Sequence, residues 1–287
     1  MFLVLGIRTD IALESKILKE KIPNGVSQNV RTVDGVKIVN IKIKNENGSK
    51  ILNRSIGTYI TLEHSNMLLP ENAQIITKIL VSELKKLISN KKSILIVGLG
   101  NKNISPDAIG PLVADKIIAT RHFKGPLADE LGLSQLNSVS VIAPGVLGQT
   151  GIEAFEVIQS MSQKINPDVI IAIDALAAKS IDRLGTTIQI TDAGISPGSG
   201  VQNKRAEISK NTLNIPVIAL GMPTVVDMET VISEMCPKQK SSASSSMMVT
   251  PRNIDQIISR SSSLISNSIN QALFPTLSPQ EIDSLSS

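Results

Sequence analysis

The side chains best suited to chemistry are two aspartates that accompany apolar segments of the chain. Asp174 ends the segment 168–174 (DVIIAID), and Asp107 follows the segment 94–97 (ILIV) after a glycine-containing turn. Uninterrupted aliphatic segments bounded by turns are typical of strands buried on both faces of a parallel sheet. Because open α/β sheets bind ligands beyond the carboxyl ends of their strands, we expect both side chains to meet in one crevice there.

A pair of this kind predicts acid–base chemistry. The two aspartates are 67 positions apart (174 − 107), which leaves room for a helix, a strand and a second helix between their strands. Two close carboxylates cannot both ionise easily, so one keeps its proton to a higher pH. The pair would then activate a water molecule and protonate a leaving amine. On local residues alone, Asp107 is also typical of the first turn of a helix opened by Ser105 and Pro106, where its role is structural.

Other reactive groups give weaker signals. The turn after residue 97 carries only two of the three glycines of a dinucleotide fingerprint, with Asn103 in place of the third. Ser199 lacks the GxSxG spacing of a nucleophile elbow. Two carboxylates and a histidine would make a metal site, but His122 is poorly placed for it. Cys236 is the sole cysteine, which excludes an intrachain disulfide. We expect no cofactor and no bound metal.

The elements that would position the aspartates alternate along the chain. Helical periodicity begins at Pro70, Thr224 and Thr250, and a further helix follows Ser105. Alternating residues in 36–44 and 55–63, joined by a turn at Glu46–Gly48, predict an N-terminal β-hairpin with one wet face. Further strands are expected at 137–142, 186–191 and 215–220. The pattern predicts an α/β fold, with a mainly parallel sheet covered by helices on both faces.

Composition narrows the class of protein. The chain has 287 residues, of which 41% are hydrophobic and only 2% aromatic, and its net charge is +4. Basic residues are not interleaved with aromatic ones, which argues against a base-stacking nucleic-acid surface. No apolar segment approaches the roughly 20 residues that span a bilayer, and the N-terminus lacks the pattern of a signal peptide. A cytoplasmic protein without a membrane or nucleic-acid partner is expected.

Collinear motifs along nearly the whole chain resemble those of the germination proteases of spore-forming bacteria. Two motifs carry the aspartates: SPDAIGP at 105–111 includes Asp107, and IAIDALAAKS at 171–180 includes Asp174. The other matching blocks are GLGN at 98–101, TRH at 120–122, APGVLGQTGIE at 143–153, TTIQITDAGISPGSGVQNKR at 186–205, IPVIALGMPTVVD at 215–227 and MVTPRNID at 248–255.

The resemblance implies an endopeptidase that initiates the degradation of small acid-soluble spore proteins during germination, in the spore core. It implies an atypical aspartic peptidase whose functional pair is Asp107 and Asp174. The family is made as a homotetrameric zymogen that removes its own propeptide. Its fold is similar to that of hydrogenase-maturation endopeptidases, whose equivalent crevice binds a metal that germination proteases are not thought to need.

The resemblance also implies a processing site near the N-terminus. The family cuts after an acidic residue and before an Ile- or Phe-Ala-x-Glu segment, and this chain carries Asp10 followed by Ile11, Ala12, Leu13 and Glu14. We therefore expect a propeptide at 1–10, cleavage of the Asp10–Ile11 bond, and a single peptidase domain at 11–287. Cleavage calls for an extended, accessible segment, as is common at chain termini. On local residues alone, an ordinary terminal segment with an Asp helix cap is the alternative.

Two further functions remain open on the sequence. One is a metal-dependent maturation-type endopeptidase on the same fold, which a chelator would inactivate. The other is a non-enzymatic binding protein in which both aspartates are structural caps. The chain departs from the family at the short, serine-rich segment 237–246 and at the turn 101–103. These departures concern zymogen control and substrate fit rather than the aspartate pair.

Overall fold

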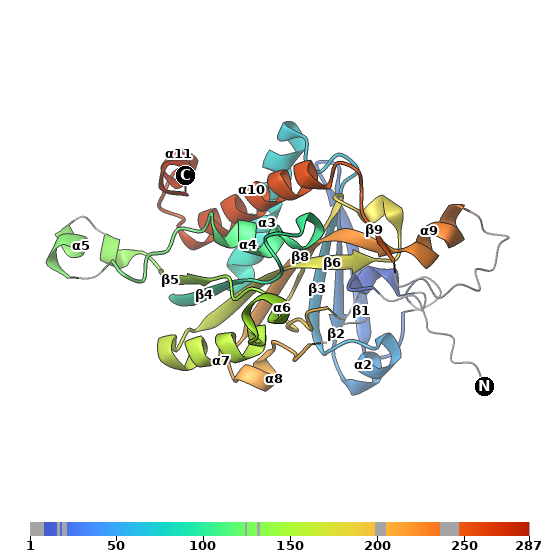
Figure 1. Cartoon of the computed structure of the whole chain (residues 1–287), viewed down its shortest axis with the longest axis horizontal. Coiled ribbons are helices and arrows are strands. Elements are labelled where there is room, and N and C mark those ends of the chain that lie inside the picture. The colour runs from blue at the N-terminus through green and yellow to red at the C-terminus, as the bar shows by residue number, and fades with distance from the viewer. Residues whose placement is uncertain are drawn as a thin grey trace.

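One large mixed sheet organises the molecule (Figure 1). Its strands follow the order β1-β2-β3-β7-β8-β6-β4-β5, with β9 added to β8, so nine strands are present in the described part of the chain. The computed structural model describes residues 9–15, 18, 22–123, 125–130, 133–198, 205–235 and 247–286. The strands are β1 (Val26–Val33), β2 (Val36–Ile43), β3 (Gly57–Glu63), β4 (Ser93–Gly98), β5 (Ser138–Ile142), β6 (Val169–Ala178), β7 (Thr187–Thr191), β8 (Val217–Asp227) and β9 (Met248–Val249).

The parallel part of the sheet consists of β5, β4, β6 and β8. Its aliphatic side chains are buried on both faces, as the uninterrupted apolar segments predict. β4 ends at Gly98, which pairs with Ile173, whereas β6 and β8 remain paired as far as Ala178 and Val226. We had expected Asp174 at the end of its strand, but it lies inside β6. It is just beyond the point at which the neighbouring β4 ends. The α/β fold itself is confirmed.

The N-terminal strands form an antiparallel meander that joins the parallel part through β3 and β7. The expected pairing of β2 with β3 is confirmed, but the turn predicted between them is a helix, α2 (Glu46–Leu52). Asn45 starts α2, because its side chain accepts a hydrogen bond from the Gly48 N–H at 3.0 Å. The tight hairpin instead joins β1, which was not predicted, to β2 through Asp34 and Gly35, both with positive φ.

Helices cover both faces of the sheet (Figure 1). α3 (Pro70–Leu87), α4 (Ile109–Ala114) and α10 (Ile254–Leu273) pack on one face, while α7 (Ala154–Ile165) and α8 (Lys210–Leu213) pack on the other. No described helix is long and apolar enough to cross a membrane. The remaining helices are η1 (Ala12–Glu14), η2 (Ser105–Asp107), α5 (Pro126–Glu130), η3 (Leu133–Gln135), α6 (Leu147–Thr150), η4 (Ile181–Arg183), α9 (Met228–Met235) and α11 (Pro279–Ser286).

The boundary between β8 and α9 differs from the expected one. The predicted helix start at Thr224 is wrong, because Val225 and Val226 pair with β6 and the helix begins only at Met228. β-branched residues favour a strand here, and a neighbouring strand is available to pair with them. The serine-rich segment 237–246 lies outside the described residues.

Two glycines allow α4 to approach the sheet closely. A Cβ atom at Gly98 would lie 2.3 Å from the carbonyl oxygen of Gly110. A Cβ atom at Gly110 would lie 2.1 Å from the Leu99 carbonyl oxygen and 2.5 Å from that of Ile173. All three contacts involve backbone atoms, which cannot move aside as a side chain can. This contact fixes the start of α4, and with it the preceding turn that carries Asp107, against the strand ends.

Replacing Gly110 with alanine should therefore destabilise the protein. We expect Gly110→Ala to lower the free energy of unfolding by about 3 kcal/mol, since overpacking against backbone is costly. Gly148→Ala is the matched control, because a Cβ there meets nothing within 4 Å; it should change stability by less than about 0.5 kcal/mol. Chemical denaturation of both variants makes the comparison, and equal stabilities would contradict the close-approach argument.

Candidate active site

Asp174 is a buried carboxyl group on the face of the sheet that α7 and α8 partly cover. Only 6% of the residue is exposed, and its Oδ1 accepts a hydrogen bond from the Ala175 N–H at 2.9 Å. Its neighbours on the same face of β6 include Ala172 and Leu176, which are apolar. The strand thus carries one ionisable side chain on an otherwise apolar surface.

A row of paired residues connects Asp174 with the antiparallel half of the sheet. Asp174 pairs with Gly221 of β8, which pairs with Gln189 of β7, which in turn pairs with Thr61 of β3. Directly paired residues point to the same face, so Asp174 and Gln189 share one surface about 10 Å apart, two strand spacings. Gly221 between them has no side chain, and a Cβ there would lie 2.5 Å from the Asp174 carbonyl oxygen.

Asp107 reaches the same edge from η2, the short helix before α4. Its Oδ2 accepts a hydrogen bond from the Asn101 N–H at 2.8 Å, and η2 contacts both β6 and β8. The Asn101 side chain is held in turn, because its Oδ1 accepts from Gln149 Nε2 at 2.8 Å. Gly100 permits the tight turn, since its φ is +112° and a Cβ there would lie 2.1 Å from the Asp107 carbonyl oxygen.

The environment of both carboxyl groups raises their pKa values. Burial raises the pKa of Asp174 well above the ordinary 3.8 of an aspartate, and the charges of Asp107 and Asp10 raise it further. Burial also raises the pKa of Asp107, although the Asn101 N–H opposes this shift. None of the ion pairs between described residues involves either aspartate. Asp174, the more deeply buried and the closer to other negative charges, is the group that keeps its proton longer.

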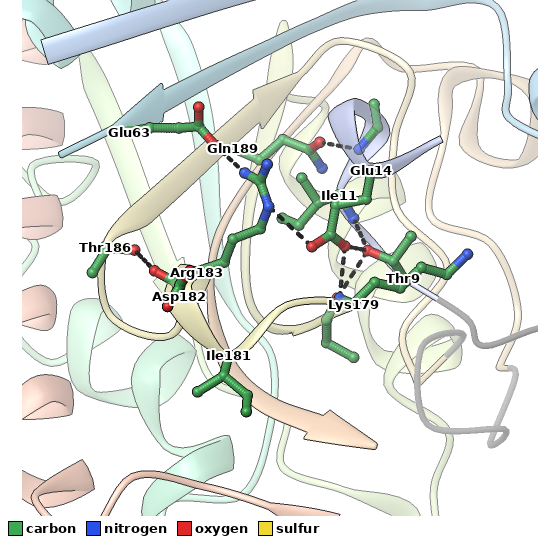
Figure 2. Close-up of polar contacts among 12 residues, drawn as sticks. Thr9, Ile11, Glu14, Glu63, Lys179, Ile181, Asp182, Arg183, Thr186 and Gln189 are labelled. Carbon is green, nitrogen blue, oxygen red and sulfur yellow. Dashed lines mark hydrogen bonds and ion pairs between the residues drawn. The ribbon is translucent and has the colours of Figure 1, made fainter. Parts of the chain in front are cut away.

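The segment with the expected processing site lies on the same surface. Asp10 N donates to the Ala177 carbonyl at 2.9 Å, and Asp10 Oδ2 accepts from Ala177 N at 2.9 Å. The Gln189 side chain, which lies next to Ile11 in Figure 2, bridges the backbone on either side of that residue. Its Nε2 donates to the Asp10 carbonyl at 2.9 Å, and its Oε1 accepts from Ala12 N at 2.8 Å. The carbonyl of the Asp10–Ile11 bond therefore accepts a hydrogen bond from the residue across Gly221 from Asp174.

The accessibility expected of this segment is wrong. Ile11 is fully buried, with 0% of its surface exposed, and Ala12 is 1% exposed. The physical reason is that both side chains pack on the sheet, where Ala12 belongs to a small apolar cluster with Val39 and Ile41 of β2. Thr9 and Asp10 are partly exposed. The segment is thus docked on the protein's own surface instead of projecting into solvent.

The described residues do not provide a ready metal site. No group of three or more His, Cys, Asp or Glu side chains among them is placed to hold a metal ion. The charges of Asp107 and Asp10 raise the pKa of Asp174, but the three side chains do not form such a cluster. The ligand set that the metal-dependent alternative requires is therefore not found in this part of the chain, and the expected independence from metal stays a prediction.

Sequence reasoning overlooked two side chains of this region, Gln189 and Arg183. Gln189 did carry a signal, because it is a polar residue among the aliphatic residues of the buried strand TIQIT. Arg183, in η4, forms ion pairs with Glu14 and Glu63. Nothing local distinguishes this arginine from a solvated one, since both its partners are distant in sequence.

Comparison with known proteins identifies the family. Residues 9–237 match the germination protease family. This chain belongs to the germination protease family. The germination protease of Caldanaerobacter subterraneus subsp. tengcongensis is 39% identical over 324 aligned positions, covering 99% of both chains. That of Clostridium tetani is 39% identical, covering 98% of this chain and 99% of its own.

The family's name supports a peptidase with a role in spore germination. A further relative, the germination protease of Geobacillus sp. (strain WCH70), is 42% identical over 80% of this chain and 66% of its own. Among solved structures, the [NiFe] hydrogenase maturation protease HycI from Thermococcus kodakarensis aligns over 67% of this chain and 98% of its own, at 17% identity and a TM-score of 0.40.

The raised pKa of Asp174 makes a prediction about stability. A carboxyl group with a higher pKa in the folded than in the unfolded state destabilises the fold once pH rises above the unfolded value of 3.8. Asp174→Asn removes this ionisation, so the variant should melt at a higher temperature than the parent at neutral pH. The difference should shrink as pH falls toward 3.8, because both states of the parent then keep the proton.

Asp168→Asn provides a control of opposite sign. Hydrogen bonds from the Ser93 and Lys92 N–H groups lower the pKa of Asp168, so its ionised form stabilises the fold. We expect this variant to melt at a lower temperature than the parent at neutral pH. Thermal melts from mildly acidic to neutral pH measure both effects, and a destabilised Asp174→Asn variant at neutral pH would refute the assignment of a raised pKa.

Proposed function

We propose that this germination protease hydrolyses peptide bonds with Asp107 and Asp174 as an acid–base pair. One observation carries the proposal: two carboxyl groups with raised pKa meet at the sheet edge where the chain's own Asp10–Ile11 segment is docked. We further propose that its substrates are small acid-soluble spore proteins, whose degradation it initiates in the spore core. These finer assignments follow from the family resemblance.

The geometry supports a division of labour between the two aspartates. Asp107, the more exposed, would act as the base that takes a proton from water as the water oxygen attacks the scissile carbonyl carbon. Asp174, which keeps its proton longer, would donate it to the leaving nitrogen as the C–N bond breaks. The Gln189 Nε2 group would stabilise the developing negative charge on the carbonyl oxygen, to which it already donates at 2.9 Å.

We propose that the chain is made as a zymogen and cleaves its own Asp10–Ile11 bond. Docking of the segment beside Asp174 supports this, because it places the bond on the enzyme's own surface without a need for solvent access. Removal of residues 1–10 would leave a mature chain that begins at Ile11. The homotetramer implied by the resemblance is likewise a proposal, and sedimentation at micromolar concentration tests it.

Substitution of either aspartate should abolish peptide cleavage while the fold persists. We expect Asp107→Asn and Asp174→Asn each to lower the turnover of a small acid-soluble spore protein by about 10²–10⁴-fold, which is typical for loss of a general acid or base. Asp115→Asn is the control, since this residue is paired with Lys102 in solvent and should retain near-parental turnover.

Two comparisons separate the alternatives. A chelator should leave the parent's activity unchanged; loss of activity that added metal restores would favour the metal-dependent peptidase instead. If the spore protein binds but no variant or parent cleaves it, the chain is a binding protein. Near-parental turnover in either aspartate variant would remove that residue from the mechanism.

Self-processing should depend on pH in a defined direction. The acid must be protonated and the base ionised, so the rate should be bell-shaped in pH. Because both pKa values are raised, both limbs should lie above the ordinary 3.8 of aspartate, and cleavage should slow as pH rises through the pKa of Asp174. N-terminal sequencing after incubation at mildly acidic and mildly alkaline pH measures the extent of cleavage.

The control for self-processing is the Asp174→Asn variant under the same conditions. It should retain an intact Met1 terminus, whereas the parent should expose Ile11. An intact Met1 terminus in fully active enzyme would refute processing at this bond. Equal cleavage of parent and variant would attribute the cut to a contaminating protease.

A further inference from the structure

The segment Thr9–Glu14 is bound to the rest of the molecule as a separate peptide ligand would be. Four of its polar partners lie far away in sequence: Ala177 of β6, Lys179 after it, Arg183 of η4 and Gln189 of β7. Figure 2 shows the last three of them. Backbone and side-chain groups both take part. The surface formed by these four residues is here called the peptide groove.

One end of the peptide groove holds a carboxylate. Glu14 is only 7% exposed, and its Oε2 accepts from the Lys179 N–H at 2.8 Å while its Oε1 lies 3.0 Å from Arg183 Nε (Figure 2). The Thr9 hydroxyl donates to Oε2 as well. Burial raises the pKa of Glu14, and the hydrogen bonds from Thr9 and the Lys179 N–H oppose that shift together with the charges of Arg183 and Lys179. A buried carboxylate with hydrogen bonds on one oxygen and an ion pair on the other is typical of a recognition pocket.

Arg183, the cation that binds Glu14, forms a second ion pair away from the bound segment. Arg183 Nη1 is paired with Glu63 of β3, whose second oxygen lies 2.9 Å from Lys37 Nζ of β2. Arg183 itself is partly buried, with 19% of its side chain exposed. The guanidinium is therefore also held by a strand that does not belong to the bound segment.

The side chains along the bound segment meet different degrees of constraint. Ile11 and Ala12 are buried completely or almost so, at 0% and 1% exposure. Leu13 is only partly buried, and Glu14 is gripped by its carboxylate. Both hydrogen bonds of the Gln189 side chain to the segment go to backbone atoms, which do not depend on the identity of the side chains. The bound segment thus presents an aliphatic residue, a small one, a partly buried one and an acidic one.

We propose that Arg183 and the Lys179 N–H bind an acidic side chain four residues after the scissile bond of a protein substrate, with the chain's own Glu14 occupying this pocket before processing. The inference rests on the proposed function, because it takes Asp10–Ile11 as the bond that is cut. It assigns Arg183 as a specificity-determining residue that contacts the substrate but not the reacting atoms.

Cleavage of the Asp10–Ile11 bond would loosen the occupant and open the groove. Thr9 would leave, removing its hydroxyl from Glu14 and its hydrogen bond from the Ile11 N–H. Asp10 would leave as well, with its two bonds to Ala177. Residues 11–14 would keep the burial of Ile11 and Ala12 and the polar contacts of Ala12 with Gln189 and of Glu14 with Arg183 and Lys179. A substrate has residues on both sides of its scissile bond. It would therefore form the lost contacts as well as the remaining ones, and would displace residues 11–14 from the groove.

The first test uses peptides and the processed parent enzyme. The probes have the sequence of residues 9–15 (TDIALES), or that sequence with Gln or Lys in place of Glu, or with Gln in place of Leu as the matched control. We expect kcat/KM to fall by roughly 10- to 100-fold for the Gln peptide and further for the Lys peptide, mainly through KM. The control should stay within a few-fold of the parent peptide. Equal kcat/KM for the Glu and Gln peptides would overturn the proposal.

The second test reverses the charge of the pocket. Arg183→Glu should lower kcat/KM for the Glu peptide and raise it for the Lys peptide, so that the order of preference inverts. A residue that only supports the fold would slow all peptides alike. Should Arg183→Glu fail to fold, Arg183→Gln should abolish the discrimination between Glu and Gln peptides. The control is Arg31→Gln. Arg31 lies in β1, where it forms an ion pair with Glu83 of α3, and its replacement should leave the preference unchanged.

A binding measurement separates this inference from the proposed function. In the full-length Asp174→Asn/Glu14→Ala variant, Glu14→Ala weakens the binding of the chain's own segment in the groove and Asp174→Asn blocks cleavage. Fluorescence anisotropy of the labelled peptides then reports their affinity alone. Tighter binding of the Glu peptide than of the Gln peptide, lost with Arg183→Gln, would support the pocket even if no parent enzyme cleaved peptides. Cleavage at Asp–Ile without any preference at the fourth position would keep the proposed function and overturn the pocket.

Discussion

The structure depends on the burial of one carboxyl group, Asp174, in a sheet built almost wholly from aliphatic residues. An ionised carboxylate in such surroundings is costly, and no described cation pairs with it. The group therefore keeps its proton to a higher pH, and the nearby Asp107 and Asp10 strengthen that tendency. The raised pKa of Asp174 thus results from where the strand places this residue.

Close backbone contacts around the strand ends position Asp107 and Asp174. Gly98 and Gly110 let α4 rest on the strand ends, and η2 before it carries Asp107 to the edge of β6. Gly221 leaves the surface between Asp174 and Gln189 free of a side chain. β4 ends while β6 and β8 continue, which creates the step in the sheet beside which these groups lie. Small residues and unequal strand lengths thus do the positioning.

The N-terminal segment links the two ends of this surface. Its Asp10 binds Ala177, three residues after Asp174 in β6, and Gln189 holds the backbone that follows. Its Glu14 occupies the Arg183 pocket (Figure 2). A chain that binds its own terminus in this way occupies the surface that a foreign peptide would need. Under the proposed function, self-processing and substrate selection would be two uses of one groove, and the same contacts would govern both.

Much of this could be predicted from local pattern. Long aliphatic segments predict the parallel strands, and an aspartate beside each of two such segments predicts the pair, because burial and sheet geometry follow from these residues alone. β1 was not predicted because its residues are mostly polar and exposed. It forms because it pairs with β2. Arg183, Glu14 and Gln189 meet only in the folded chain, since their proximity depends on strand order and on the docked terminus. The sequence by itself determined the fold class and the two aspartates; only the tertiary structure decided what lies between them, because contacts between distant segments leave no local periodicity to detect.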